Sequence, residues 1–139
     1  MKVCCKLNNI NDLREKGLYD RISKYFHLSD GMLNLTLNAQ YTVYGVLFRE
    51  NAPWYYLCND YDDEYPRPFP AELFQVVEPQ FSSSWVLSTH NTRKGDVCCS
   101  LVFDEWADDP GFYERLIEGE PQAIALFQKY RKLIDNEIN

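Results

Sequence analysis

The chain has 139 residues, of which 45% are hydrophobic and 15% aromatic, so it can build a packed core and is not an intrinsically disordered chain. This length predicts a single domain over residues 1–139. No segment approaches the ~18 consecutive apolar residues of a membrane helix, and Met1–Lys6 lacks the apolar run of a signal peptide. We therefore expect a cytoplasmic protein without membrane contact.

The formal net charge of −7 is concentrated in the middle of the chain. Residues 60–120 contain 14 Asp and Glu against 4 Lys and Arg, a charge of −10, whereas residues 1–59 carry +2 and residues 121–139 carry +1. A field of this sign repels phosphate backbones and attracts basic proteins, so we expect a protein partner with a basic surface and no nucleic acid. The alternative is that the acidic residues only maintain solubility.

Residues 1–32 predict an N-terminal arm followed by short helices. Lys2–Leu7 is expected to form a short edge strand or an extended arm. Asn11 can cap a helix over Asp12–Lys16, and apolar residues at helical spacing predict a second helix over Leu18–Phe26. The Asp30-Gly31 pair is typical of a turn.

Residues 33–103 predict an antiparallel β-meander. Leu33–Leu37 alternates apolar and polar residues, which favours a half-buried strand or the lead into one. Tyr41–Arg49 is apolar on both faces, as in a central strand, and Gly45 predicts a bulge or sharp bend within it. A hairpin turn is then expected to lead into a strand over Trp54–Asn59.

The second half of the meander follows a segment rich in proline. Asp60–Pro70 contains three prolines and is predicted to be a long ordered loop, because proline cannot donate to a strand ladder. Further strands are predicted at Leu73–Val77, Trp85–Ser88 and Val97–Phe103, with a polar loop at His90–Gly95.

Residues 108–138 predict two helices. Asp108 or Asp109 can cap the first, with Pro110 at its first position, and Gly119 ends it. Pro121 opens the second helix, which carries an apolar stripe of Ile124, Phe127, Tyr130, Leu133 and Ile134.

The architecture that these elements predict is α+β. A twisted antiparallel β-meander of about five strands, bent like an SH3-like barrel, is expected to carry short N-terminal helices and a C-terminal helical hairpin packed on it.

No motif in the sequence predicts catalysis, a metal site or a cofactor. The odd number of cysteines, five, favours reduced thiols in the core, and Cys4-Cys5 and Cys98-Cys99 lack the spacers of zinc-ligand pairs. Cys58 is predicted to be core and His90 exposed, which disfavours a nucleophilic pair. Three carboxylates are crowded in one short run: Asp62, Asp63 and Glu64. Hydrolases usually position two catalytic carboxylates on separate rigid elements, so this run does not predict a hydrolase.

Binding of a protein partner is the function that these observations favour. Aromatic residues interleaved with acids are typical of recognition surfaces, since aromatic side chains anchor a partner and charges steer it. Trp54–Tyr56 is more simply explained as core, and a solvated rim is the alternative for the acidic segment. The predicted contact residues form two patches: Asp60, Tyr61, Asp62, Asp63, Glu64 and Tyr65, then Asp104, Glu105, Asp108 and Asp109.

Three stretches carry a resemblance to a known class of protein: YTVYGVLFRENAPWYYLCND, YPRPFPAELFQVVEPQFSSSW and FYERLIEGEPQAIALFQKY. They resemble small bacterial proteins, some of which are similar to immunity partners of polymorphic or contact-dependent growth inhibition toxins. The resemblance implies a toxin-neutralising role and supplies no functional residues. The alternatives are an SH3-like adaptor and a small enzyme of unknown chemistry; we expect a non-enzymatic binding protein.

Overall fold

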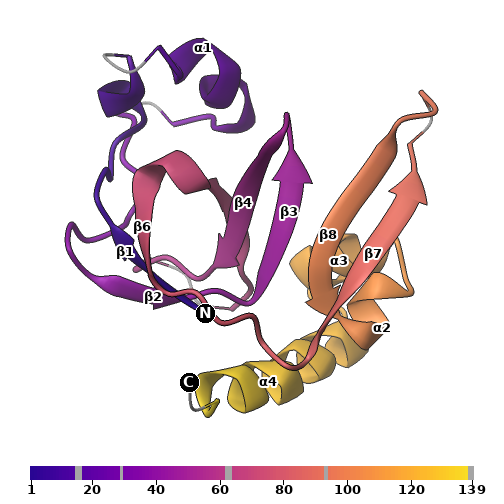
Figure 1. Ribbon diagram of the computed structural model, residues 1–139. Helices are drawn as coiled ribbons and strands as arrows, with labels where there is room; N and C mark the ends of the chain where they lie inside the picture. Colours follow the sequence, from indigo (N-terminus) through magenta and orange to yellow (C-terminus); the bar gives the residue numbers. More distant parts are fainter. Residues whose placement is uncertain (15–16, 29, 62–63, 93, 138–139) are drawn as a thin grey trace.

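Two antiparallel sheets organise the molecule (Figure 1). The computed structural model describes residues 1–14, 17–28, 30–61, 64–92 and 94–137. The smaller sheet has the order β2 (Gln40–Thr42), β1 (Lys2–Cys5) and β6 (Phe74–Glu78). The larger sheet has the order β5 (Arg67–Pro70), β4 (Ala52–Leu57), β3 (Gly45–Arg49), β8 (Val97–Phe103) and β7 (Trp85–Asn91).

The helices lie mainly between β1 and β2 and after β8. The N-terminal part holds α1 (Tyr19–Ile22) between 3₁₀ turns at Ile10–Leu13 and Ser23–Tyr25, and a further 3₁₀ turn covers Ala71–Leu73. The C-terminal part holds α2 (Asp104–Ala107), α3 (Phe112–Ile117) and α4 (Pro121–Asp135). The α+β class is confirmed, whereas the sheets do not close into one barrel, so the SH3-like barrel is not confirmed.

The chain passes from one sheet to the other at Gly45. The predicted strand Tyr41–Arg49 is broken, because β2 ends at Thr42 in the small sheet and β3 starts at Gly45 in the large one. A Cβ atom on Gly45 would lie 3.0 Å from Val102 Cγ1 and 3.2 Å from the Leu101 carbonyl oxygen. The break between the strands therefore lies at Val43–Tyr44, just before the glycine where a bulge or bend was predicted, and the close contacts at Gly45 leave little room for a side chain.

The prediction for the first strand was wrong, and for residues 33–37 only the second alternative, a lead into the following strand, fits the structure. Lys2–Leu7 is not an edge strand or arm, because β1 lies between β2 and β6 and buries Val3, Cys4 and Cys5. Leu33–Leu37 forms no strand; Asn34 has a positive φ of 58°, which interrupts extended backbone, while Leu33 and Leu35 are buried.

The proline-rich segment ends in a strand, contrary to the prediction of a loop up to Pro70. β5 pairs with β4 in the register Trp54↔Pro70 and Tyr56↔Pro68. Both prolines fit because β5 is the last strand of its sheet, where backbone N–H groups on the outer side need no partner.

The last two strands form the longest pair in the structure. β8 coincides with the predicted strand Val97–Phe103. β7 is longer than predicted and continues to Asn91, so His90 lies in a strand, opposite Cys98, and not in a loop. β7 forms the outer edge of the large sheet (Figure 1).

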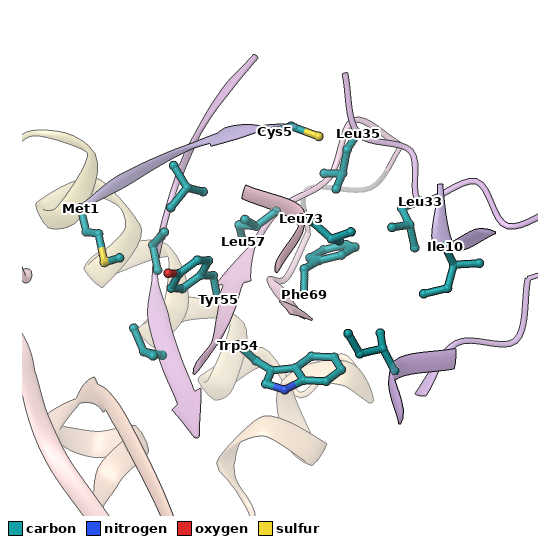
Figure 2. Close-up of a cluster of buried hydrophobic side chains, with 14 of the residues drawn as sticks. Met1, Cys5, Ile10, Leu33, Leu35, Trp54, Tyr55, Leu57, Phe69 and Leu73 are labelled. Atoms are coloured by element: carbon teal, nitrogen blue, oxygen red, sulfur yellow. The ribbon is translucent and has the colours of Figure 1, made fainter. Parts of the chain in front are cut away.

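Buried side chains form two hydrophobic clusters. The first lies between the two sheets and the N-terminal segment and contains the fully buried Trp54, with Leu57, Phe69 and Leu73 nearby (Figure 2). The second lies between the large sheet and the C-terminal helices and contains Phe103. Leu47 packs against both clusters, so this side chain connects them.

The C-terminal helices differ in detail from the prediction. α2 was not predicted, and α3 starts only at Phe112, with Gly111 as its N-cap residue. α4 starts at Pro121 as predicted, but its buried residues are Ala123, Phe127 and Ile134, whereas Ile124 and Leu133 are exposed.

Candidate functional site

The first predicted patch begins with a residue that is held by internal hydrogen bonds. One carboxylate oxygen of Asp60 accepts from the Tyr41 hydroxyl at 2.8 Å, and the other accepts from Thr36 Oγ1 at 2.6 Å. The Asp60 backbone N–H donates to the Asn34 carbonyl at 2.8 Å. Asp60 therefore ties the start of the acidic segment to β2 and to the chain just before it. Asp62 and Asp63 lie outside the described residues.

Tyr61 is the most exposed large hydrophobic side chain in the described part of the protein, at 84%. It lines an apolar pocket of about 220 Å³ formed by the N-terminal segment and β5, which we call the front pocket. Leu28 and Met32, exposed by 42% and 39%, line the same pocket. Its full lining is Phe26, Leu28, Met32, Leu33, Asn34, Asn59, Tyr61, Arg67 and Phe69.

The other end of the acidic segment lines a second pocket. Glu64, which is exposed, and Tyr65 meet Ile117 and Ile124 of α3 and α4 around a hollow of about 270 Å³, the rear pocket. Ile117 and Ile124 are 45% and 37% exposed. The described ends of the acidic segment thus each border a hollow with exposed aliphatic side chains.

Tyr113 joins the acidic segment to α2. Its hydroxyl donates to the Pro66 carbonyl at 2.7 Å, and its ring lies edge-on to Tyr65 with centroids 6.5 Å apart. The same ring stacks on Trp106 of α2 at 5.7 Å. One buried aromatic contact therefore supports both predicted patches.

The four acids of the second patch divide into two pairs. Asp104 and Asp108 are exposed. Asp109 forms an ion pair with Arg115 and accepts a hydrogen bond from the Gly111 N–H, and the arginine lowers the pKa of this carboxyl. Glu105 accepts from the Tyr130 hydroxyl, so it holds α2 against α4. Asp104 and Asp108 are the better candidates for contact with a partner.

The hydrogen bond between Glu105 and Tyr130 gives a testable pH dependence. It lowers the pKa of Glu105 and raises the pKa of Tyr130 to about 12. A lowered carboxyl pKa adds stability above the unfolded value of about 4.3, and this stability is lost as pH falls through the folded pKa. We expect Glu105→Gln to reduce the free energy of unfolding at pH 7 and to differ less from the wild type at pH 3, as measured by urea unfolding. Equal losses at both pH values would contradict this role of the carboxylate.

The described residues contain no group of three His, Cys, Asp or Glu side chains placed to hold a metal ion. Cys58 is partly buried beside the second cluster, and His90 lies on the exposed β7 strand. Within the described ranges, no helix is long and apolar enough to cross a bilayer.

Sequence reasoning missed the apolar residues that line the two pockets. Leu28 and Met32 come from the N-terminal part of the chain, Ile117 from α3 and Ile124 from α4, and only the fold brings them beside the acidic segment. The available signal was the presence of these apolar residues, which does not tell exposed from buried positions. By contrast, Trp54 and Tyr56 are buried, as expected for core residues.

The fold and these surfaces define a class only in general terms: an α+β protein whose acidic segment lies beside exposed apolar side chains from other parts of the chain. Comparison of the chain with protein-family models, with curated proteins and with solved structures found no match.

Proposed function

We propose that the protein is a non-catalytic binding protein, an immunity protein that neutralises a cognate bacterial toxin by covering its basic surface. The observation that carries this proposal is that the acidic 60–65 segment borders the front pocket at one described end and the rear pocket at the other. Tyr61 stands exposed beside the front pocket and Glu64 beside the rear pocket. A partner can place apolar side chains in the hollows while its cations meet the carboxylates.

The charge distribution supports a partner such as a nuclease. A protein that holds nucleic acid needs a basic surface, and the −10 charge of residues 60–120 complements it. Attraction between opposite charges raises association rates and is screened by salt. Binding through the 60–65 segment would exclude the toxin's own substrate.

Binding to the toxin domain encoded beside this chain's gene tests the proposal. We expect the wild-type chain to rescue cells that express that domain, with an association rate that falls steeply as salt increases. Tyr61→Ala is expected to weaken the complex about tenfold or more, because an exposed aromatic anchor is lost without loss of core packing. Glu64→Lys is expected to slow association.

Asp12→Lys is the matched control, since Asp12 is an exposed acid in a 3₁₀ turn of the N-terminal segment. It should change the association rate much less than Glu64→Lys. A salt-independent association rate, or full rescue by the Tyr61→Ala and Glu64→Lys variants together, would argue against the proposal.

An SH3-like adaptor is the second candidate, and the front pocket is the observation that favours it. Phe26, Tyr61 and Phe69 give this pocket an aromatic lining suited to short peptides. An adaptor of this kind would bind several partners with micromolar affinity and would not rescue cells from one particular toxin.

A further inference from the structure

The two outer strands of the large sheet are protected very differently. β5 carries Pro68 and Pro70, which lack an N–H, and the cation Arg67. β7 has seven residues without a proline or a charged side chain. Natural proteins usually guard an exposed sheet edge with proline, lysine or a covering element, because an open edge can pair with another strand. β7 is therefore the unguarded edge of this sheet.

The outward-facing backbone groups of β7 can be identified from the register. The Thr92 N–H donates to the Asp96 carbonyl at 2.8 Å, and the pairing continues without a shift from Asn91↔Val97 to Trp85↔Phe103. Because alternate residues of an antiparallel strand face the partner, Leu87 and Thr89 direct their N–H and C=O groups away from β8. Trp85 belongs to the same alternating set, and its N–H indeed points away from β8, because it donates to the Ser82 carbonyl at 3.2 Å.

The surroundings of this edge indicate which kind of strand would fit. Val86 and Leu87 are 41% and 64% exposed, so an added strand would cover apolar surface. Ser88 Oγ donates to the Ala107 carbonyl at 3.0 Å, which fixes α2 against β7. Asp104 of α2 and Asp108, the residue after it, carry exposed carboxylates on the element that this bond holds against β7.

We infer that the outer edge of β7 docks an extended, basic segment of the protein partner, which adds a sixth strand to the large sheet. Main-chain hydrogen bonds from Leu87 and Thr89 supply the pairing, and Asp104 and Asp108 select lysine and arginine side chains. A second copy of this chain fits less well, because it would bring its own Asp104 and Asp108 to the same edge. The inference deepens the proposed function and rests on it.

A peptide of about seven residues, matched to β7, tests the edge directly. The probe alternates lysine and valine with blocked termini, and its counterpart has glutamate in place of lysine. We expect the lysine peptide to slow amide hydrogen exchange at Leu87 and Thr89 by tenfold or more, measured by NMR, and the glutamate peptide to have no effect. The double variant Asp104→Asn, Asp108→Asn should weaken binding of the lysine peptide.

Leu87→Pro is the decisive variant. It removes an outward N–H but no hydrogen bond to β8, so the protein should fold while peptide binding is lost. Leu87→Thr is its matched control, because it removes the leucine side chain, keeps the N–H and should still bind the peptide. Circular dichroism and an unchanged unfolding midpoint would establish that Leu87→Pro is folded; if it is not, Thr89→Pro tests the same edge.

Several outcomes would overturn the inference: no protection by the lysine peptide, equal binding by Leu87→Pro, or protection mapped to the 60–65 segment. Self-association that protects Leu87 in the absence of peptide would also overturn it, in favour of a second copy. Different results contradict the inference and the proposed function. If Leu87→Pro rescues cells as well as the wild type does, only the inference about the β7 edge is wrong. If the peptide binds but the wild-type chain gives no rescue from the toxin, the proposed function is wrong.

Discussion

Trp54→Ala is expected to lower the free energy of unfolding by about 3–5 kcal/mol, the range typical of a large aromatic residue removed from a core. Trp54 is fully buried and sits in a cage of aromatic rings and one cation. Its indole lies edge-on to Tyr25 at 5.0 Å and is stacked near Phe26 at 6.3 Å, and the Arg49 guanidinium lies 4.7 Å from the ring. Removal of the indole leaves a cavity at the junction of β4 with the N-terminal segment.

Trp54→Phe is the control for this prediction. The indole N–H of Trp54 is buried and makes no hydrogen bond within the part of the chain that the structure describes. A phenyl ring keeps much of the packing and removes this unpaired donor, so the loss should be clearly smaller than for alanine. Urea unfolding followed by circular dichroism gives both values; similar losses for the two variants would contradict the described packing.

Phe103→Ala is expected to cost about 3–5 kcal/mol as well, through the second hydrophobic cluster. Phe103 is 1% exposed at the end of β8, where its ring stacks on Tyr130 of α4 at 4.1 Å and meets Phe112 of α3 at 5.3 Å. It is therefore the side chain that joins the large sheet to both long C-terminal helices. Phe48→Ala is the control, because Phe48 is 42% exposed and the same substitution there should lower the free energy of unfolding much less.

The two alanine variants together test the prediction of a single domain. Leu47 packs against both clusters, so damage to either one should lower the stability of the whole chain. Each variant should then show one transition, with the same midpoint by tryptophan fluorescence and by circular dichroism. Two separated transitions in Phe103→Ala would indicate that the C-terminal helices unfold on their own.

Local patterns predicted those elements whose neighbours in sequence are also their neighbours in space. β8 is a mostly apolar run between a polar loop and the acidic residues that start at Asp104, so both its bounds were predicted correctly. Pro121 marks the start of α4 because proline fits the first helical position. An irregularity was predicted at Gly45, whereas the chain leaves the small sheet after Thr42 and β3 of the large sheet starts at Gly45, and nothing local indicates the change of sheet.

The wrong predictions concern strand partners, which depend on distant segments. β1 became central because β2 and β6 pair with it from residues 40–42 and 74–78, and no local signal in Lys2–Cys5 encodes this. β5 was excluded as a strand on account of its prolines, yet an edge position removes that objection. In α4, Ala123 is buried together with Phe127 and Ile134, whereas the predicted apolar stripe contained only large side chains and omitted this alanine.

The candidate site was predictable only in its charge. The acidic block follows from composition, whereas the exposure of Tyr61 and the internal bonds of Asp60, Glu105 and Asp109 depend on the rest of the fold. The pockets beside Tyr61 and Glu64 and the open edge of β7 are products of tertiary structure, so they required the fold.

The central position of β1 has a consequence for synthesis of the protein on the ribosome. β1 is translated first, but one of its two partners, β6, ends only at Glu78, and β3 must wait for β8, which ends at Phe103. Most of the chain therefore has to emerge before either sheet is complete, and the nascent N-terminal half exposes unpaired apolar strands in the meantime. Slow acquisition of structure and dependence on chaperones during translation are the expected result.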